Sequence, residues 1–219
     1  SRRGLDELSE QERNVLEDIS LFVKQETNHA HLHASFNREM YARGYGAVKP
    51  YEGKLKDYYQ KLREEKSLAF NLAYCAGFEN IALFSAKFVF IAAPDLFEGG
   101  DPRMTDLFKW HLAEEFEHRT VAHAAFMMYS GSYWLRLKGA WEAFKSLNKF
   151  QGDILEIILA ADRETMTAEE IKASKRRVKQ LKGRMGFFVL PRLFQILLPN
   201  YDPSQHEMPA NIRSSLLKY

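Results

Sequence analysis

Long stretches of this chain repeat apolar residues at steps of three and four, with few helix-breaking residues between them. The first stretch, 5–43, has apolar positions at Leu8, Val15, Ile19 and Phe22, a spacing typical of amphipathic helices. Glycine (12 of 219 residues) and proline (7 of 219) are both scarcer than the roughly 7% and 5% of average proteins. The sequence has no alternating strand pattern and no internal repeat, and it therefore predicts an all-α bundle of long helices.

Glycines and prolines divide the chain into its expected elements. The first helix is expected to end at Gly44, and 48–54 to be a connection because it contains Pro50 and Gly53. The remaining helices are expected at 55–65, 67–93, 103–129, 133–161 and 167–186.

Length, charge and cysteine content narrow the class of protein. A chain of 219 residues fits a single domain spanning 1–219. The 31 basic and 29 acidic residues nearly balance, which suggests no nucleic-acid partner. The single Cys75 excludes a disulfide framework and a thiolate zinc cluster, and it fits a reducing compartment. With no secretion signal visible, we expect a cytoplasmic protein.

The first long helix carries a Glu-x-x-His motif, Glu26 to His29. On a helix, residues three apart differ by only about 60° in direction, so both side chains can reach one metal ion. His33 lies seven residues after Glu26, about 20° away in direction, and joins the same stripe. His31 points elsewhere and is expected at the surface or beside the ligands.

A second Glu-x-x-His motif, Glu115 to His118, lies in the stretch 103–129, and His111 precedes it by one turn on the same face. Glu114 falls near that face and is the competing ligand, whereas Glu117 points away. One such motif is a weak signal, because any helix rich in Glu and His produces it. Two copies on two long helices, each extended by an in-phase histidine, are a strong signal for a metal site.

Glu79 lies within an otherwise apolar helix. A buried carboxylate without a partner costs several kcal/mol, so this group should be paired, protonated or bound to metal. One interpretation is a salt bridge to an arginine or to Lys87. The two Glu-x-x-His helices favour the other, that Glu79 is a metal ligand.

Glu26, Glu79 and Glu115 supply three carboxylates, one fewer than the four that would neutralise two divalent cations. A dinuclear carboxylate site in a helical bundle takes its fourth carboxylate from a single Glu on a further helix. Within the chain the only later candidates are Asp153 and Glu156. The alternative, which we favour, is a glutamate upstream of Ser1, on a helix that this sequence does not include.

These motifs resemble a bacterial family, labelled predicted metal-dependent hydrolases, of the ferritin-like superfamily. The resemblance extends to the segment 198–203 and implies a ferritin-like bundle whose N-terminal region carries a Gly-Glu-containing helix before Ser1. The set is also similar to the di-iron site of p-aminobenzoate N-oxygenases, which implies that His111 is an extra metal ligand. The residues that carry the resemblance are Gln25, Glu26, His29, His33, Asn37, Glu79, His111, Glu115 and His118.

The ligand set predicts two metal ions, with iron favoured over manganese or zinc, because it mixes carboxylate and imidazole groups without thiolate. We expect a non-heme di-iron oxygenase or oxidase that acts with O2 on a small, partly apolar substrate, because such bundles recur in di-iron and di-manganese proteins. One alternative is a hydrolase that uses a metal-bridged water. Another is a metal-storage protein, which the enclosed apolar surroundings disfavour.

The C-terminal part combines a basic helix with an apolar run. Thr167 and Glu170 form a capping box that opens the basic helix, and the apolar run 187–198 is expected to be broken at Pro191. That run is too short to span a bilayer. We expect this run to pack on the bundle. Alternatively, it makes a peripheral membrane contact or lines an apolar substrate pocket. We also expect that the protein can form a homodimer.

Overall fold

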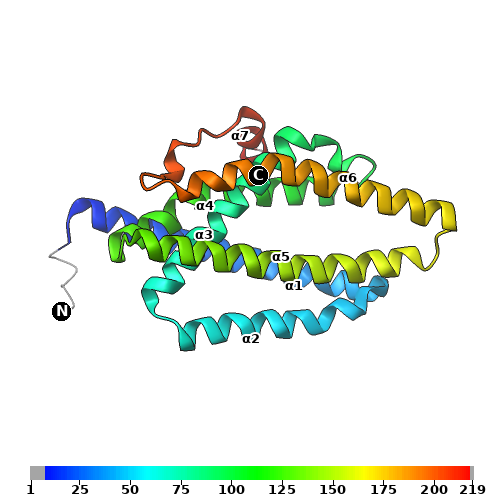
Figure 1. Cartoon of the computed structure of the whole chain (residues 1–219), viewed down its shortest axis with the longest axis horizontal. Coiled ribbons are helices and arrows are strands. Elements are labelled where there is room, and N and C mark those ends of the chain that lie inside the picture. The colour runs from blue at the N-terminus through cyan, green and yellow to red at the C-terminus, as the bar shows by residue number, and fades with distance from the viewer. Residues whose placement is uncertain (1–7, 218–219) are drawn as a thin grey trace.

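The computed structural model describes residues 8–217, which form a bundle of long helices without a strand (Figure 1). The predicted all-α fold is therefore confirmed for this part of the chain. The main helices are α1 (Glu10–Met40), α2 (Lys49–Glu65), α3 (Leu68–Lys87), α4 (Pro102–Tyr129), α5 (Tyr133–Arg163), α6 (Ala168–Leu193) and α7 (Ala210–Leu216).

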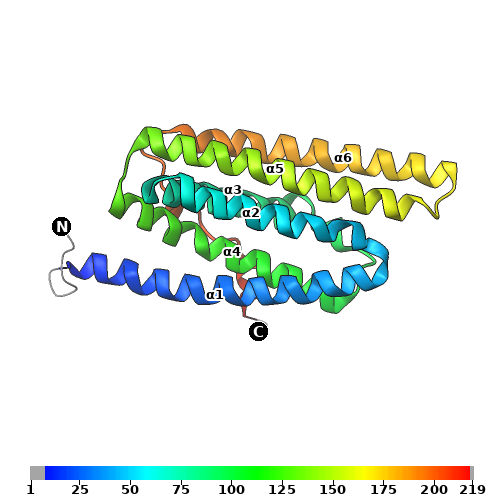
Figure 2. The ribbon, with the colours of Figure 1, turned by 90° about the horizontal axis from the view of Figure 1, so that it is seen from below.

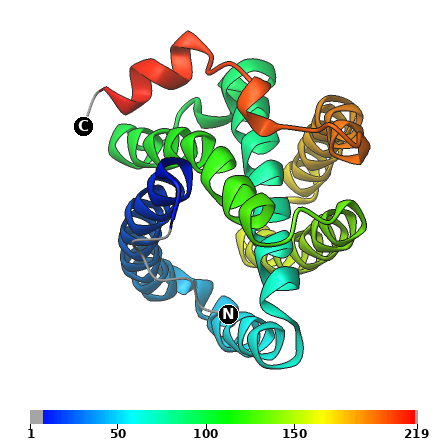
Figure 3. The same cartoon turned by 90° about the vertical axis from the view of Figure 1, so that its left-hand side faces the viewer.

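Helix α3 is the centre of the bundle. It packs against α4 on one side and α5 on another, and α1 packs on α4 (Figure 3). Helices α5 and α6 run side by side along the molecule (Figure 2). Phe84 of α3 and Phe116 and Phe126 of α4 are fully buried and fill the core between these helices. The ligand-bearing helices α1, α3 and α4 are thus neighbours.

The segment Leu68–Ala92 is long and apolar enough to cross a bilayer, by length and composition only. It contains α3 and the π-helical turn Phe88–Ala92. In this structure 56% of its most apolar window is buried by the surrounding helices. A core helix of a bundle has the same composition, because it is apolar on all sides.

Two helix boundaries differ from the sequence predictions. The segment 48–54 is not a connection, because α2 already begins at Lys49. Pro50 lies in its first turn, where a missing backbone N–H costs nothing. Nor does Pro191 break the apolar run, since α6 continues to Leu193. Pro191 and Phe187 are both exposed, so water can bond to the Phe187 carbonyl that Pro191 leaves without a helical partner.

Glycine brings α3 and α5 into close contact. A Cβ atom on Gly139 of α5 would lie 2.4 Å from the carbonyl carbon of Ala73, and one on Gly77 of α3 would lie 2.5 Å from the Cα atom of Ala140. Real Cβ atoms essentially never come so close to backbone. The two helices therefore pack backbone against backbone at this crossing, which fixes the position of α3 and its Glu79.

Replacing Gly139 by alanine should lower the free energy of unfolding by about 1–3 kcal/mol, because the new methyl group forces the two backbones apart. Gly152→Ala on the same helix is the matched control, because nothing lies within 4 Å of its Cβ position. This control should raise the stability by up to about 1 kcal/mol through helix propensity alone. Urea denaturation measures both, and equal effects would contradict the close contact.

Candidate metal centre

Helices α1 and α4 bring the two Glu-x-x-His motifs together. One ligand atom from each of Glu26, His29, Glu115 and His118 lies within 4.8 Å of the others. Glu26 is partly exposed, and the other three side chains are buried. Among the described residues this is the group whose side chains could jointly hold a metal ion.

The Nδ1 atoms of both histidines face the carboxylates. His118 Nδ1 lies 2.9 Å from Glu26 Oε1, and His29 Nδ1 lies 3.3 Å from the same oxygen and 3.5 Å from Glu115 Oε1. Both Nδ1 atoms, Glu26 Oε1 and Glu115 Oε2 are buried without a well-formed hydrogen bond. Buried polar atoms that converge in this way fit a cation, so the donor set suits a metal ion.

The opposite edge of each imidazole ring is held by the other helix. His29 Nε2 lies 2.7 Å from Glu114 Oε2 of α4, and His118 Nε2 lies 3.3 Å from Gln25 Oε1 of α1. The Gln25 amide also donates to Glu114 Oε1 at 3.2 Å, which closes the network. Metal-binding histidines are commonly oriented by such outer hydrogen bonds, which leave the second ring nitrogen free for the ion.

This network gives Glu114 a different role from the one expected, and it adds Gln25 to the residues of the site. The sequence suggested Glu114 as a competing ligand, whereas the structure places it on the outer side of His29. Gln25 is among the residues that carry the family resemblance, but no role was predicted for it. The signal that could have found it is positional, because Gln25 and Glu114 each directly precede the glutamate of a Glu-x-x-His motif.

Glu79 of α3 is 3% exposed, and its Oε2 atom has no hydrogen-bond partner. No arginine or lysine pairs with it among the described residues, and Lys87 lies instead beside His206 and over the ring of Phe116. Burial and the neighbouring charge of Glu115 raise the pKa of Glu79 well above its usual value. The salt-bridge interpretation is therefore wrong, and a protonated or metal-bound carboxyl group remains.

The two additional in-phase histidines lie at the edge of the cluster. His111 Nε2 is 3.5 Å from Glu115 Oε1, and its ring lies edge-on to His29 with centroids 4.2 Å apart. His33 contacts His111, with ring centroids 4.9 Å apart, but it does not reach the carboxylates. The structure thus places His111 next to Glu115 and His29, and His33 next to His111.

Asp153 and Glu156, the later candidates for a fourth carboxylate, lie elsewhere. Both are on α5 and form ion pairs, Asp153 with Lys149 at 3.1 Å and Glu156 with Lys182 at 3.8 Å. The remaining histidines are also away from the cluster. His31 is exposed, and His123 and His206 pack against Tyr201.

Charge pairing dominates the electrostatics of the cluster. Burial opposes the charged form of His29, but contacts with Glu115, Glu26 and Glu114 outweigh it and raise its pKa to about 10. Burial likewise opposes the charged form of His118, whose pKa rises to about 9 beside Glu115 and Glu26. Burial would raise the pKa of Glu26, yet the two histidines lower it to about 2. Without metal, the imidazolium groups thus neutralise the carboxylates.

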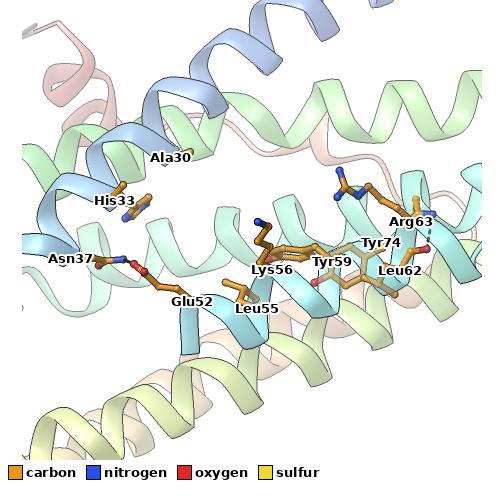
Figure 4. Close-up of a pocket in the computed structure, with 12 residues that line it drawn as sticks. Ala30, His33, Asn37, Glu52, Leu55, Lys56, Tyr59, Leu62, Arg63 and Tyr74 are labelled. Carbon is orange, nitrogen blue, oxygen red and sulfur yellow. Dashed lines mark hydrogen bonds between the residues drawn. The ribbon is translucent and has the colours of Figure 1, made fainter. Parts of the chain in front are cut away.

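A cavity of about 640 Å³ opens beside the site, between α1, α2 and α3. His33 of α1 lines one wall, facing Lys56 and Tyr59 of α2 across the cavity, with Arg63 and Tyr74 further along (Figure 4). On the other side Phe22 lies edge-on to His118, with ring centroids 4.9 Å apart. His33 therefore lines the cavity and also contacts His111 at the edge of the cluster.

Residues 2–207 match the model of a family described as "Predicted metal-dependent hydrolase". The match covers most of the chain, so this protein belongs to that family. No curated protein and no solved structure matches the chain. The family description and the Glu/His cluster agree on a metal-dependent protein, and neither identifies the metal.

Glu115→Ala should abolish metal binding, because Glu115 is buried and faces both His29 and His118. Glu117→Ala is the matched control, because Glu117 is exposed two residues further along the same helix. Metal content after reconstitution measures both. Equal losses in the two variants would show that the wrong face of α4 had been assigned.

Metal binding should release protons. At pH 7 the pKa values of about 10 and 9 keep His29 and His118 protonated in the metal-free protein, and each must lose a proton before it can bind a metal. We expect about two protons released per chain near pH 7 from the histidines, a third if Glu79 ionises on binding, and an apparent affinity that rises with pH up to about 10. Calorimetric zinc titrations in buffers of different ionisation enthalpy measure this release, and a value of zero would contradict the assignment.

Proposed function

We propose that this protein is a dinuclear metal enzyme whose ions lie among Glu26, Glu79, Glu115, His29 and His118. The observation that carries the proposal is the convergence of two Glu-x-x-His motifs, on α1 and α4, together with the buried Glu79 of α3, whose Oε2 atom has no hydrogen-bond partner. Two such motifs and single glutamates are the ligand set of dinuclear carboxylate sites in helical bundles.

The residues divide into three roles under this proposal. Glu26 and Glu115 lie between the two histidines and are placed to share the ions. His29 and His118 each offer an Nδ1 atom, and Gln25 and Glu114 keep those rings oriented. Glu79 approaches from α3, and because it is almost fully buried it would be bound in ionised form only beside a cation.

We favour an oxygenase or oxidase with two irons. Nitrogen and oxygen ligands without thiolate suit iron, and iron supplies one-electron chemistry with O2 when bound. O2 is then the oxidant, and an oxygenase also requires an external electron donor. The cavity beside His33 has room for a small, partly apolar substrate, because Tyr59 and Tyr74 line it.

A hydrolase is the second candidate, and the family description favours it. In that case the paired ions would lower the pKa of a water molecule and polarise the bond to be cleaved. The same five ligands serve both functions, and the identity of the metal separates them. Zinc supports hydrolysis, whereas iron supports reaction with O2.

The proposal includes a fourth carboxylate, from outside the described residues. Helices α1 and α3 both pack on α4. A glutamate that joined Glu26, Glu79 and Glu115 would bring the carboxylates to four, which balances two divalent cations. If a longer chain whose added residues contain no carboxylate near the site bound both metals fully, this part of the proposal would fail.

Metal analysis and a visible spectrum of aerobically purified protein test the proposed function. We expect about two irons per chain and a visible ligand-to-metal charge-transfer band that disappears on reduction. Stoichiometric zinc without a band would contradict the oxygenase and favour the hydrolase. The Glu115→Ala variant is the control, because it should lose both the metal and the band.

A further inference from the structure

The outer sides of α5 and α6 expose large apolar side chains at one end of the helix pair. Trp134 and Trp141 lie two turns apart on α5, and Phe187, Leu190 and Phe194 lie along the end of α6 and the turn that follows it. Phe187 is 88% exposed and Trp134 is 70% exposed. We call these five residues the apolar patch. Single exposed apolar residues are ordinary, but several large ones at one end of a helix pair are typical of an interaction surface.

The two halves of the patch belong to one end of the molecule. Helices α5 and α6 lie side by side (Figures 1 and 2). Tyr133, next to Trp134, donates a hydrogen bond of 2.7 Å to the carbonyl of Leu197. Arg136 donates to the carbonyl of Leu198, which ties the start of α5 to the turn after α6. The start of α5 thus lies beside the end of α6.

Helix α6 also concentrates positive charge. It carries eight basic and two acidic residues, a net charge of +6, whereas the whole chain carries only +2. Lys182 pairs with Glu156, and Arg184 pairs with Asp95. No ion pair with a carboxylate occurs, within residues 8–217, for the exposed Lys172, Lys175, Arg176, Arg177 and Lys179.

The basic and apolar side chains share one stripe of α6. Each helical residue advances by about 100°, so Arg176 and Phe194 fall within about 20° of Phe187 in direction, and Lys172 falls within about 60°. All four are exposed. A flat partner that lies along α6 would therefore contact charge at the first half of the helix and aromatic rings at the second half.

We propose that this face of α5 and α6 docks on the surface of an anionic phospholipid bilayer. Exposed Trp, Phe and Leu beside Lys and Arg are the residues with which amphipathic helices bind at the headgroup level. The unpaired basic groups complement anionic lipids, and each contributes attraction close to such a surface. A second copy of the chain complements the face less well, because each copy would bring a helix of charge +6 to the interface.

Flotation of the full chain with vesicles tests this inference, with phosphatidylcholine alone compared with a mixture containing phosphatidylglycerol. We expect binding to the anionic vesicles only, weakened by salt, with a blue shift of tryptophan emission as Trp134 and Trp141 leave water. Two double variants, Phe187→Ser with Phe194→Ser and Lys172→Glu with Arg176→Glu, should each reduce partitioning at least about tenfold.

The matched control is Arg13→Glu with Lys24→Glu, which changes the net charge equally at exposed positions of α1. It should bind as the unaltered chain does, and circular dichroism and metal content verify that every variant folds. Absence of binding to anionic vesicles would overturn the inference, as would equal losses in the control. Self-association that disappears in the Phe187→Ser, Phe194→Ser variant, without vesicle binding, would instead identify an interface between copies of this chain.

Discussion

The attachment of α1 to the rest of the bundle depends on the Glu/His cluster. Of the 31 residues of α1, His29 is the one that is fully buried, and it lies between Glu114 and Glu115 of α4. The apolar residues of α1 that pack on α4, such as Phe22 and Phe36, are only half-buried, so they contribute less than fully buried side chains would. A charged and hydrogen-bonded site therefore joins one helix to the bundle. A metal ion that bound there would stabilise the same contact, because it would bind the folded arrangement and not the separated helices.

The cluster brings three carboxylates together, and their mutual repulsion must be offset. In the metal-free protein the positive charges of His29 and His118 provide this balance, and the pKa of Glu79 rises because that group is buried and lies beside the charge of Glu115. Gln25 and Glu114 cross between α1 and α4 and hold both rings with Nδ1 inward. The two Nδ1 atoms that hold protons tightly in the metal-free protein are thus also the atoms that would release them to bind metal ions.

The sequence predicted the parts of this site that follow from helical periodicity. Glu26 with His29 and Glu115 with His118 share faces because three residues span nearly one turn, and Glu79 stood out as a carboxylate in an apolar helix. His33 has the right phase, but it lies further along α1, one ring beyond His111. Phase alone does not determine where along their axes two helices meet. The contacts of Gln25 and Glu114 depend on that same register between helices, so their shared position before each motif marks them as candidates but does not give their partners. Pro50 and Pro191 misled the prediction because their positions, in a first turn and at an exposed site, tolerate proline.

The proposed function requires that metal binds between the Nδ1 atoms of His29 and His118. Anomalous diffraction from crystals of the metal-loaded protein tests it most directly. We expect anomalous peaks inside the cluster, within bonding distance of both Nδ1 atoms and of Glu26 and Glu115, with Glu114 still bonded to His29 Nε2. A peak bound to Nε2 of either ring, or located at His31, His123 or His206 instead, would contradict it.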